Sequence, residues 1–154
     1  MQSRRYSYGA TSAIVTGMAL AVGLDAATAT RATIVSGLLI VAFADNLTDS
    51  LSIHIYQESE HLEPHTAFRA TVTNFATRLA VSISFVLVVL VLPVHVAVWC
   101  VLGWGFLLLV ILTIRLARER NIAVGPEIAK HLGLAVGVIA AGRLIGTSIL
   151  SWLP

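Results

Sequence analysis

Charged residues and cysteine are both scarce in this sequence. Only 12% of its 154 residues are charged, whereas 57% are hydrophobic, and an average soluble domain is about 25% charged. This shortage of charge argues against a water-soluble globule. The single cysteine, Cys100, excludes a disulfide framework within one chain and a metal site built from several thiolates.

Motifs that carry enzymatic chemistry are also missing. No serine lies in a nucleophile elbow, and there is no glycine-rich phosphate loop, because the glycines are spaced for helix packing. We therefore expect that the protein is not an enzyme and that it holds no bound prosthetic group.

The chain consists instead of long apolar segments, which give it a mean hydropathy of +0.88. A helix needs about 20 predominantly apolar residues to cross a bilayer. We therefore predict an all-α integral membrane protein, a single transmembrane domain over residues 1–154 with five helices and no separate soluble domain. The predicted helices cover about residues 10–29, 32–56, 67–92, 96–116 and 127–153.

The distribution of positive residues predicts the orientation of these helices. The ten Lys and Arg residues are dispersed among apolar segments and form no basic face, so we expect no nucleic-acid partner. With five crossings, seven of the ten lie on or near the side of the N-terminus, which predicts a cytoplasmic N-terminus. The expected location is the plasma membrane of a prokaryote. The seven residues are Arg4, Arg5, Arg69, Arg115, Arg118, Arg120 and Lys130.

The second predicted helix has a polar second half that carries two carboxylates. Asp45 and Asp49 are four residues apart and share one face, which Ser52 continues, with Thr48 beside it. A charge at membrane depth costs about 2.5–3.5 kcal/mol on insertion scales and tends to be functional. Such a pair suits a hard divalent cation, which prefers oxygen ligands. It can also carry protons, because two close carboxylates resist ionising together.

The alternative is a purely structural role for the two aspartates. Arg78 in the third predicted helix and Arg143 in the fifth also lie at or near membrane depth, so two Asp and two Arg can neutralise one another as ion pairs. We expect the nearby Asn46 and Asn74 to form hydrogen bonds between helices rather than to bind metal.

The segment QESEHLEPHT, between the second and third predicted helices, is a second candidate metal site. Mixed histidine and carboxylate ligands fit Fe(II), Mn(II) or Zn(II). A solvated acidic loop without metal is the alternative, and the proline in this segment disfavours a continuous helix. The candidate ligands are Glu58, Glu60, His61, Glu63 and His65.

Three segments together resemble the vacuolar iron transporter family. GATSAIVTGMALAVGLDAA resembles its opening helix, GLLIVAFADNLTDSLSIHIYQESE its second helix, and GLAVGVIAAGRLIGTSIL its Gly/Ala-rich fifth helix. The resemblance implies a homodimer that exchanges Fe(II) or Mn(II) for protons along its first two helices. The family's first-helix aspartate falls at Ser12 here, and its second-helix Met and Glu ligands fall near Asn46 or Leu47 and near Ser50 or Leu51. Asp45 and Asp49 are displaced from those positions, so they would be substitutes for the family's ligands. Its cytoplasmic metal-binding helices are reduced to about ten residues.

We therefore expect a membrane transporter of divalent metal cations, iron or manganese, that is coupled to protons. Its expected partners are the lipid bilayer and a second copy of the chain, because small residues in the first and last predicted helices permit close backbone packing. The alternative is a non-transporting membrane scaffold or interaction protein of the same fold whose charges are paired internally.

Overall fold

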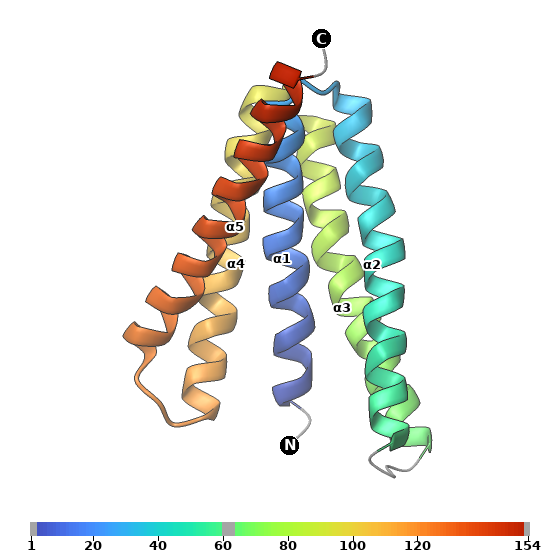
Figure 1. Ribbon diagram of the computed structural model, residues 1–154. Helices are drawn as coiled ribbons and strands as arrows, with labels where there is room; N and C mark the ends of the chain where they lie inside the picture. The colour runs from blue at the N-terminus through green and yellow to red at the C-terminus, as the bar shows by residue number, and fades with distance from the viewer. Residues whose placement is uncertain (1–2, 60–63, 153–154) are drawn as a thin grey trace.

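In the part of the chain that the structure describes, the residues form five helices (Figure 1). The computed structural model describes residues 3–59 and 64–152, and these ranges contain no β-strand. The prediction of an all-α fold with five helices is confirmed for these residues. The helix ends differ from the predicted ones by one to three residues, except that the first helix begins seven residues earlier, at Ser3. The helices are α1 (Ser3–Ala26), α2 (Arg31–Ser59), α3 (Pro64–Val91), α4 (Val94–Glu119) and α5 (Val124–Trp152).

Four of the five helices are long and apolar enough to cross a membrane. Their candidate spans are Arg31–Tyr56, Phe68–Val91, Val94–Glu119 and Val124–Trp152. The apolar part of α1, Ala10–Ala26, is shorter. Several apolar helices therefore indicate a membrane protein, while the fifth crossing and the side on which the N-terminus lies remain predictions.

Local sequence signals account for the helix ends. Pro64 is the first residue of α3 and Pro93 directly precedes α4, positions where the missing backbone N–H of proline costs no helical hydrogen bond. Thr30 precedes α2, and its Oγ1 accepts a hydrogen bond from the backbone N–H of Thr33 at 3.3 Å, as an N-cap residue does. Asn121, which follows α4, has a positive φ of 52°, a conformation that asparagine adopts more readily than most residues.

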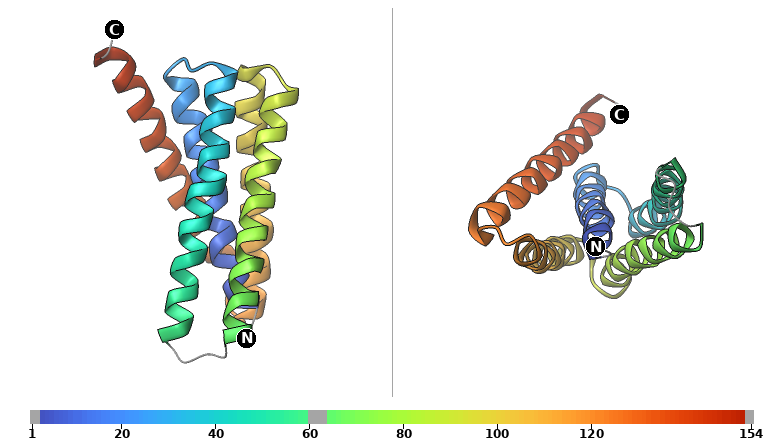
Figure 2. Two further views of the ribbon diagram at one scale, coloured as in Figure 1. Left: turned by 90° about the vertical axis from the view of Figure 1, so that its right-hand side faces the viewer. Right: turned by 90° about the horizontal axis from the view of Figure 1, so that it is seen from below.

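Helix α1 lies in the middle of the bundle and packs against all four other helices (Figure 2). The apolar core includes Ile14 and Met18 of α1, Phe85 of α3 and Val101 of α4, all fully buried. Gly17 permits the approach of α3, because a Cβ atom there would lie 2.6 Å from the Phe85 ring. The close packing around α1 thus depends on a residue without a side chain.

Helix α5 crosses α1 with their backbones in contact. A Cβ atom on Gly142 would lie 2.8 Å from the carbonyl oxygen of Ala19, and one on Gly23 would lie 2.9 Å from that of Gly142. Close approach at small residues is common between membrane helices. Part of the small-residue pattern that predicted a dimer is therefore used within one chain, whereas Gly133 and Gly137 of α5 face open space.

Candidate functional site

The polar halves of α2 and α3 pack against each other. These two helices are consecutive and antiparallel, and they form the most extensive helix pair of the bundle. The polar second half of α2 therefore lies beside the polar first half of α3. Asp45 and Asp49 of α2 meet Asn74 and Arg78 of α3, which are likewise four residues apart.

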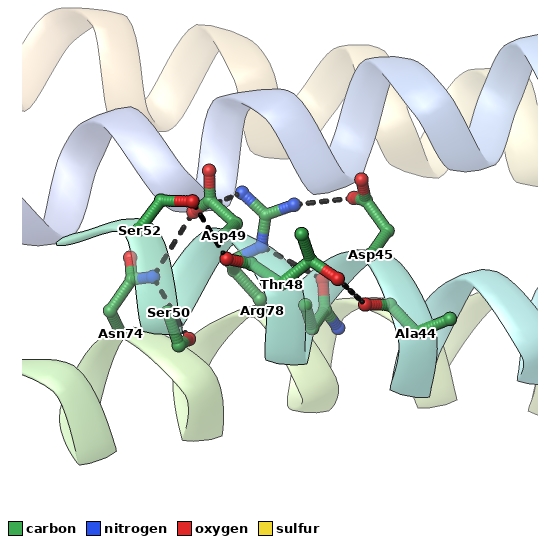
Figure 3. A network of polar contacts seen from close by, with 9 residues as sticks. Ala44, Asp45, Thr48, Asp49, Ser50, Ser52, Asn74 and Arg78 are labelled. Atoms are coloured by element: carbon green, nitrogen blue, oxygen red, sulfur yellow. Dashed lines mark hydrogen bonds and ion pairs between the residues drawn. The ribbon is translucent and has the colours of Figure 1, made fainter. Parts of the chain in front are cut away.

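Arg78 bridges both aspartates from α3. Its Nη2 donates to Oδ2 of Asp45 at 2.6 Å, its Nη1 donates to Oδ2 of Asp49 at 2.9 Å, and its Nε donates to Oδ1 of Asn46 at 2.8 Å (Figure 3). The Arg78 side chain is only 1% exposed. A buried guanidinium is stable when its N–H groups are satisfied and a carboxylate offsets its charge. Both conditions hold here, and we call Asp45, Arg78 and Asp49 the Asp–Arg–Asp cluster.

Two asparagines complete the surroundings of this cluster. Nδ2 of Asn74 donates to Oδ2 of Asp49 at 3.3 Å and to Oγ of Ser50 at 3.4 Å. The expectation that Asn46 and Asn74 form hydrogen bonds between helices is therefore confirmed. Nδ2 of Asn46 and Oδ1 of Asn74 are buried and have no hydrogen-bond partner in the described part of the chain. Since buried polar atoms are usually paired, these two are the least satisfied atoms around the cluster.

The charges of the cluster do not balance. Two carboxylates surround one guanidinium, which leaves a formal charge of −1 when all three groups are ionised. The aspartate side chains also remain partly exposed, Asp45 by 46% and Asp49 by 39%. The cluster thus combines a buried positive centre with two accessible carboxylates, a combination that can accept a proton or a cation.

The hydroxyl groups on the same face of α2 bond to their own helix. Oγ1 of Thr48 donates to the carbonyl oxygen of Ala44 at 2.8 Å, and Oγ of Ser52 donates to that of Thr48 at 2.9 Å. Ser52, a predicted metal ligand, is exposed one turn from Asp49. Its hydroxyl bonds to the backbone of α2 rather than to the Asp–Arg–Asp cluster in the described residues, and its role as a ligand stays a prediction.

The alternative in which Arg143 also pairs with these aspartates is wrong for Arg143. A single arginine, Arg78, pairs with both, whereas Arg143 is exposed on α5 and lines a small cavity with Asp25 of α1. The physical reason is the helix order in space, because α5 packs on α1 and α4 rather than alongside the polar half of α2.

Most of the second candidate metal site lies outside the described residues. This holds for Glu60, His61 and Glu63, and also for the side chain of Glu58 in the last turn of α2. His65, in the first turn of α3, is exposed. Within the described residues, no three His, Cys, Asp or Glu side chains come together as a metal-binding group. A metal site in this segment therefore stays a prediction.

A simple signal in the sequence identifies the contacts between α2 and α3. In an antiparallel helical hairpin, residues at equal distances from the middle of the link lie at the same height. Asp45 and Arg78 are 33 residues apart and Asp49 and Asn74 are 25 apart, and both pairs have the same midpoint, in the link between the helices. Consecutive helices usually pack together, so this symmetry would have selected Arg78 over Arg143.

Comparison with known proteins adds no assignment to this geometry. The chain matches no family model, no curated protein and no solved structure. The resemblance to vacuolar iron transporters therefore depends on the three sequence segments alone.

Proposed function

We propose that this protein is a membrane transporter of cations and that the Asp–Arg–Asp cluster is the site where the cation binds during transport. The observation that carries this proposal is the unbalanced charge of the cluster. Two partly exposed carboxylates share one buried arginine on a helix long and apolar enough to span a bilayer. An ionised group at membrane depth is costly unless another charge offsets it. A cation or proton from the aqueous phase supplies that charge.

The positive charge of Arg78 determines how much additional positive charge the cluster can bind. One proton or one monovalent cation brings the formal charge from −1 to zero. A divalent cation added beside Arg78 would instead bring it to +1. Binding of iron or manganese, the cargo that the resemblance implies, therefore requires the guanidinium to move away from the carboxylates. Release of the metal would let Arg78 return and restore the formal charge of −1, and one carboxylate could then take up a proton from the aqueous phase, which is a physical route to coupling metal movement with proton movement.

We also propose that two copies of the chain associate in the bilayer. The carboxylates of α2 are partly exposed in the single chain, and charged groups within membranes face protein or water-filled cavities rather than lipid. A second copy beside this face would separate the carboxylates from lipid and enclose a water-accessible path. A chain that is monomeric in bilayers while it transports cations would contradict this part of the proposal.

One observation favours a second candidate function, a non-transporting membrane scaffold. Both aspartates accept hydrogen bonds from the same arginine, as purely structural ion pairs would. In that case the cluster holds α2 and α3 together. Removing it would lower the stability of the protein, and there would be no ion transport to measure in the wild type or in the variants.

Cation uptake into proteoliposomes distinguishes the two candidates. The purified chain is tested with Fe(II), Mn(II), Zn(II) and Ca(II), with a pH-sensitive dye inside the vesicles. We expect uptake of at least one cation, accompanied by proton movement, and its loss in the Asp45→Asn and Asp49→Asn variants.

The matched control removes a carboxylate elsewhere. Glu119→Gln changes an exposed residue at the end of α4 and should transport like the wild type. Absence of flux from correctly folded wild-type protein, for all four metals and for protons, would favour the scaffold. Unchanged flux in both aspartate variants would exclude the cluster as the transport site.

A further inference from the structure

Helices α1, α4 and α5 enclose a second charged feature, separate from the Asp–Arg–Asp cluster of α2 and α3. It is a small cavity of about 80 Å³. Asp25 and Arg143 supply its charged groups, and Trp99 and Leu102 of α4 supply part of its apolar lining. We call this cavity and its lining the Asp25–Arg143 pocket.

The two charged groups of this pocket have no partner within the described residues. Neither side chain forms a hydrogen bond or an ion pair there, and they do not pair with one another. Arg143 lies within the candidate span Val124–Trp152, where an arginine needs a counter-charge or access to water. Arg78 illustrates the requirement, because it donates to three acceptor oxygens, two of which belong to carboxylates. The pocket therefore presents one cation and one anion that are both available to a ligand.

Helix α1 ends and helix α4 begins at the same end of the bundle (Figure 1), and the pocket residues of these two helices lie toward that end. Asp25 is in the last turn of α1, and Trp99 is in the second turn of α4, with 69% of its surface exposed. Tryptophan is enriched at membrane–water interfaces, where lipid headgroups lie. A ligand at this height is surrounded by headgroups on one side and by apolar helix surface on the other.

One anion and one cation that line the same cavity complement a zwitterion that contains a phosphate and a primary ammonium group. The planar N–H fork of a guanidinium fits phosphate oxygens, and Arg143 is exposed enough to reach them. An ammonium group has three N–H donors for the Asp25 carboxylate. A water molecule occupies about 30 Å³ in the liquid, so the 80 Å³ cavity has room for the ammonium end but not for a whole headgroup.

We propose that the Asp25–Arg143 pocket binds the headgroup of phosphatidylethanolamine, with the phosphate on Arg143 and the ammonium on Asp25. Phosphatidylcholine fits less well, because its methylated ammonium is larger and has no N–H to donate. Phosphatidylglycerol offers the phosphate but no cation, so Asp25 repels it. The apolar surfaces of α4 and α5 beside the pocket accommodate the acyl chains, which identifies a membrane lipid rather than a soluble zwitterion as the ligand.

Lipid selectivity of the purified full-length chain tests this proposal without any transport measurement. Delipidated protein in detergent is titrated with phosphatidylethanolamine, phosphatidylcholine or phosphatidylglycerol of identical acyl chains, and bound lipid is counted by native mass spectrometry. We expect the wild type to bind phosphatidylethanolamine at least about tenfold more tightly than the other two, a ratio typical of one good charge-assisted contact. Equal affinity for all three lipids would overturn the proposal.

Three variants assign the selectivity to this pocket. Arg143→Gln should weaken binding of phosphatidylethanolamine about tenfold, and Asp25→Asn should abolish the preference over phosphatidylcholine. Arg31→Gln, which removes an exposed arginine at the same end of the bundle, should bind as the wild type does. The proposal fails if Arg31→Gln has the same effect as Arg143→Gln. It also fails if soluble phosphoethanolamine competes as well as the lipid does.

Discussion

The geometry of the Asp–Arg–Asp cluster predicts that losing one aspartate lowers the free energy of unfolding only slightly, whereas losing both lowers it severely. In Asp49→Asn, Arg78 keeps its hydrogen bond to Asp45 at 2.6 Å, and the formal charge of the cluster changes from −1 to zero. A hydrogen bond to a charged group contributes about 1.5–3 kcal/mol and a neutral one about 1 kcal/mol. Because Asn still accepts a hydrogen bond and Asp49 is 39% exposed, we expect a loss of about 1 kcal/mol. Asp45→Asn should cost a similar amount.

The double variant has a different physical consequence. With both carboxylates gone, the Arg78 guanidinium remains 1% exposed without any anion beside it. Removing the partner of a buried charge costs about 3–5 kcal/mol. Two additive single losses would amount to only about 2 kcal/mol in total, so we expect an excess of about 1–3 kcal/mol in the double variant.

This excess is measured by denaturant titration in mixed micelles. Circular dichroism reports the unfolding, and each titration gives a free energy of unfolding. Thr48→Val is the matched control, because its exposed hydroxyl bonds only to the backbone of α2, and it should change stability by less than about 0.5 kcal/mol. A double-variant loss equal to the sum of the single losses would refute the shared-arginine argument. So would a loss of 3–5 kcal/mol in Asp49→Asn alone, because it would mean that Asp45 does not hold Arg78.

Two further predictions concern packing and orientation. Gly142→Ala should lower the melting temperature, because its Cβ would lie 2.8 Å from a carbonyl oxygen of α1 and overpacking costs about 1–3 kcal/mol. Gly137→Ala, which adds its Cβ to open space, should not lower it, and equal effects would contradict the close α1–α5 contact. In a Cys100→Ser background, a cysteine at Thr28 should react with a membrane-impermeant reagent added to intact cells, and one at Glu119 should not. The opposite pattern would reverse the orientation that the positive residues predict.

The existence of the helices was predictable, because it depends on local features of the sequence. Runs of apolar residues of membrane-spanning length and the prolines near three helix starts indicate helices without any knowledge of tertiary contacts. The packing of α5 was not predictable in the same way. Glycines that permit a close contact within one chain also permit one between two chains. Only the structure assigns Gly142 to an internal contact with α1 and leaves Gly137 facing open space.

The candidate site was harder to predict from the sequence than the helices were. The pairing of its charges depends on which helices are neighbours in space. The i, i+4 spacing of Asp45 and Asp49 placed both carboxylates on one face, but it did not identify their partner. Hairpin symmetry identifies Arg78, because α2 and α3 are consecutive and their link fixes which residues are at equal height. No such rule applies to Asp25 and Arg143. They come from the first and last helices and line one pocket only because α5 crosses α1 at its glycines. Contacts between consecutive helices can thus be inferred from the sequence, whereas contacts between distant helices require the three-dimensional arrangement.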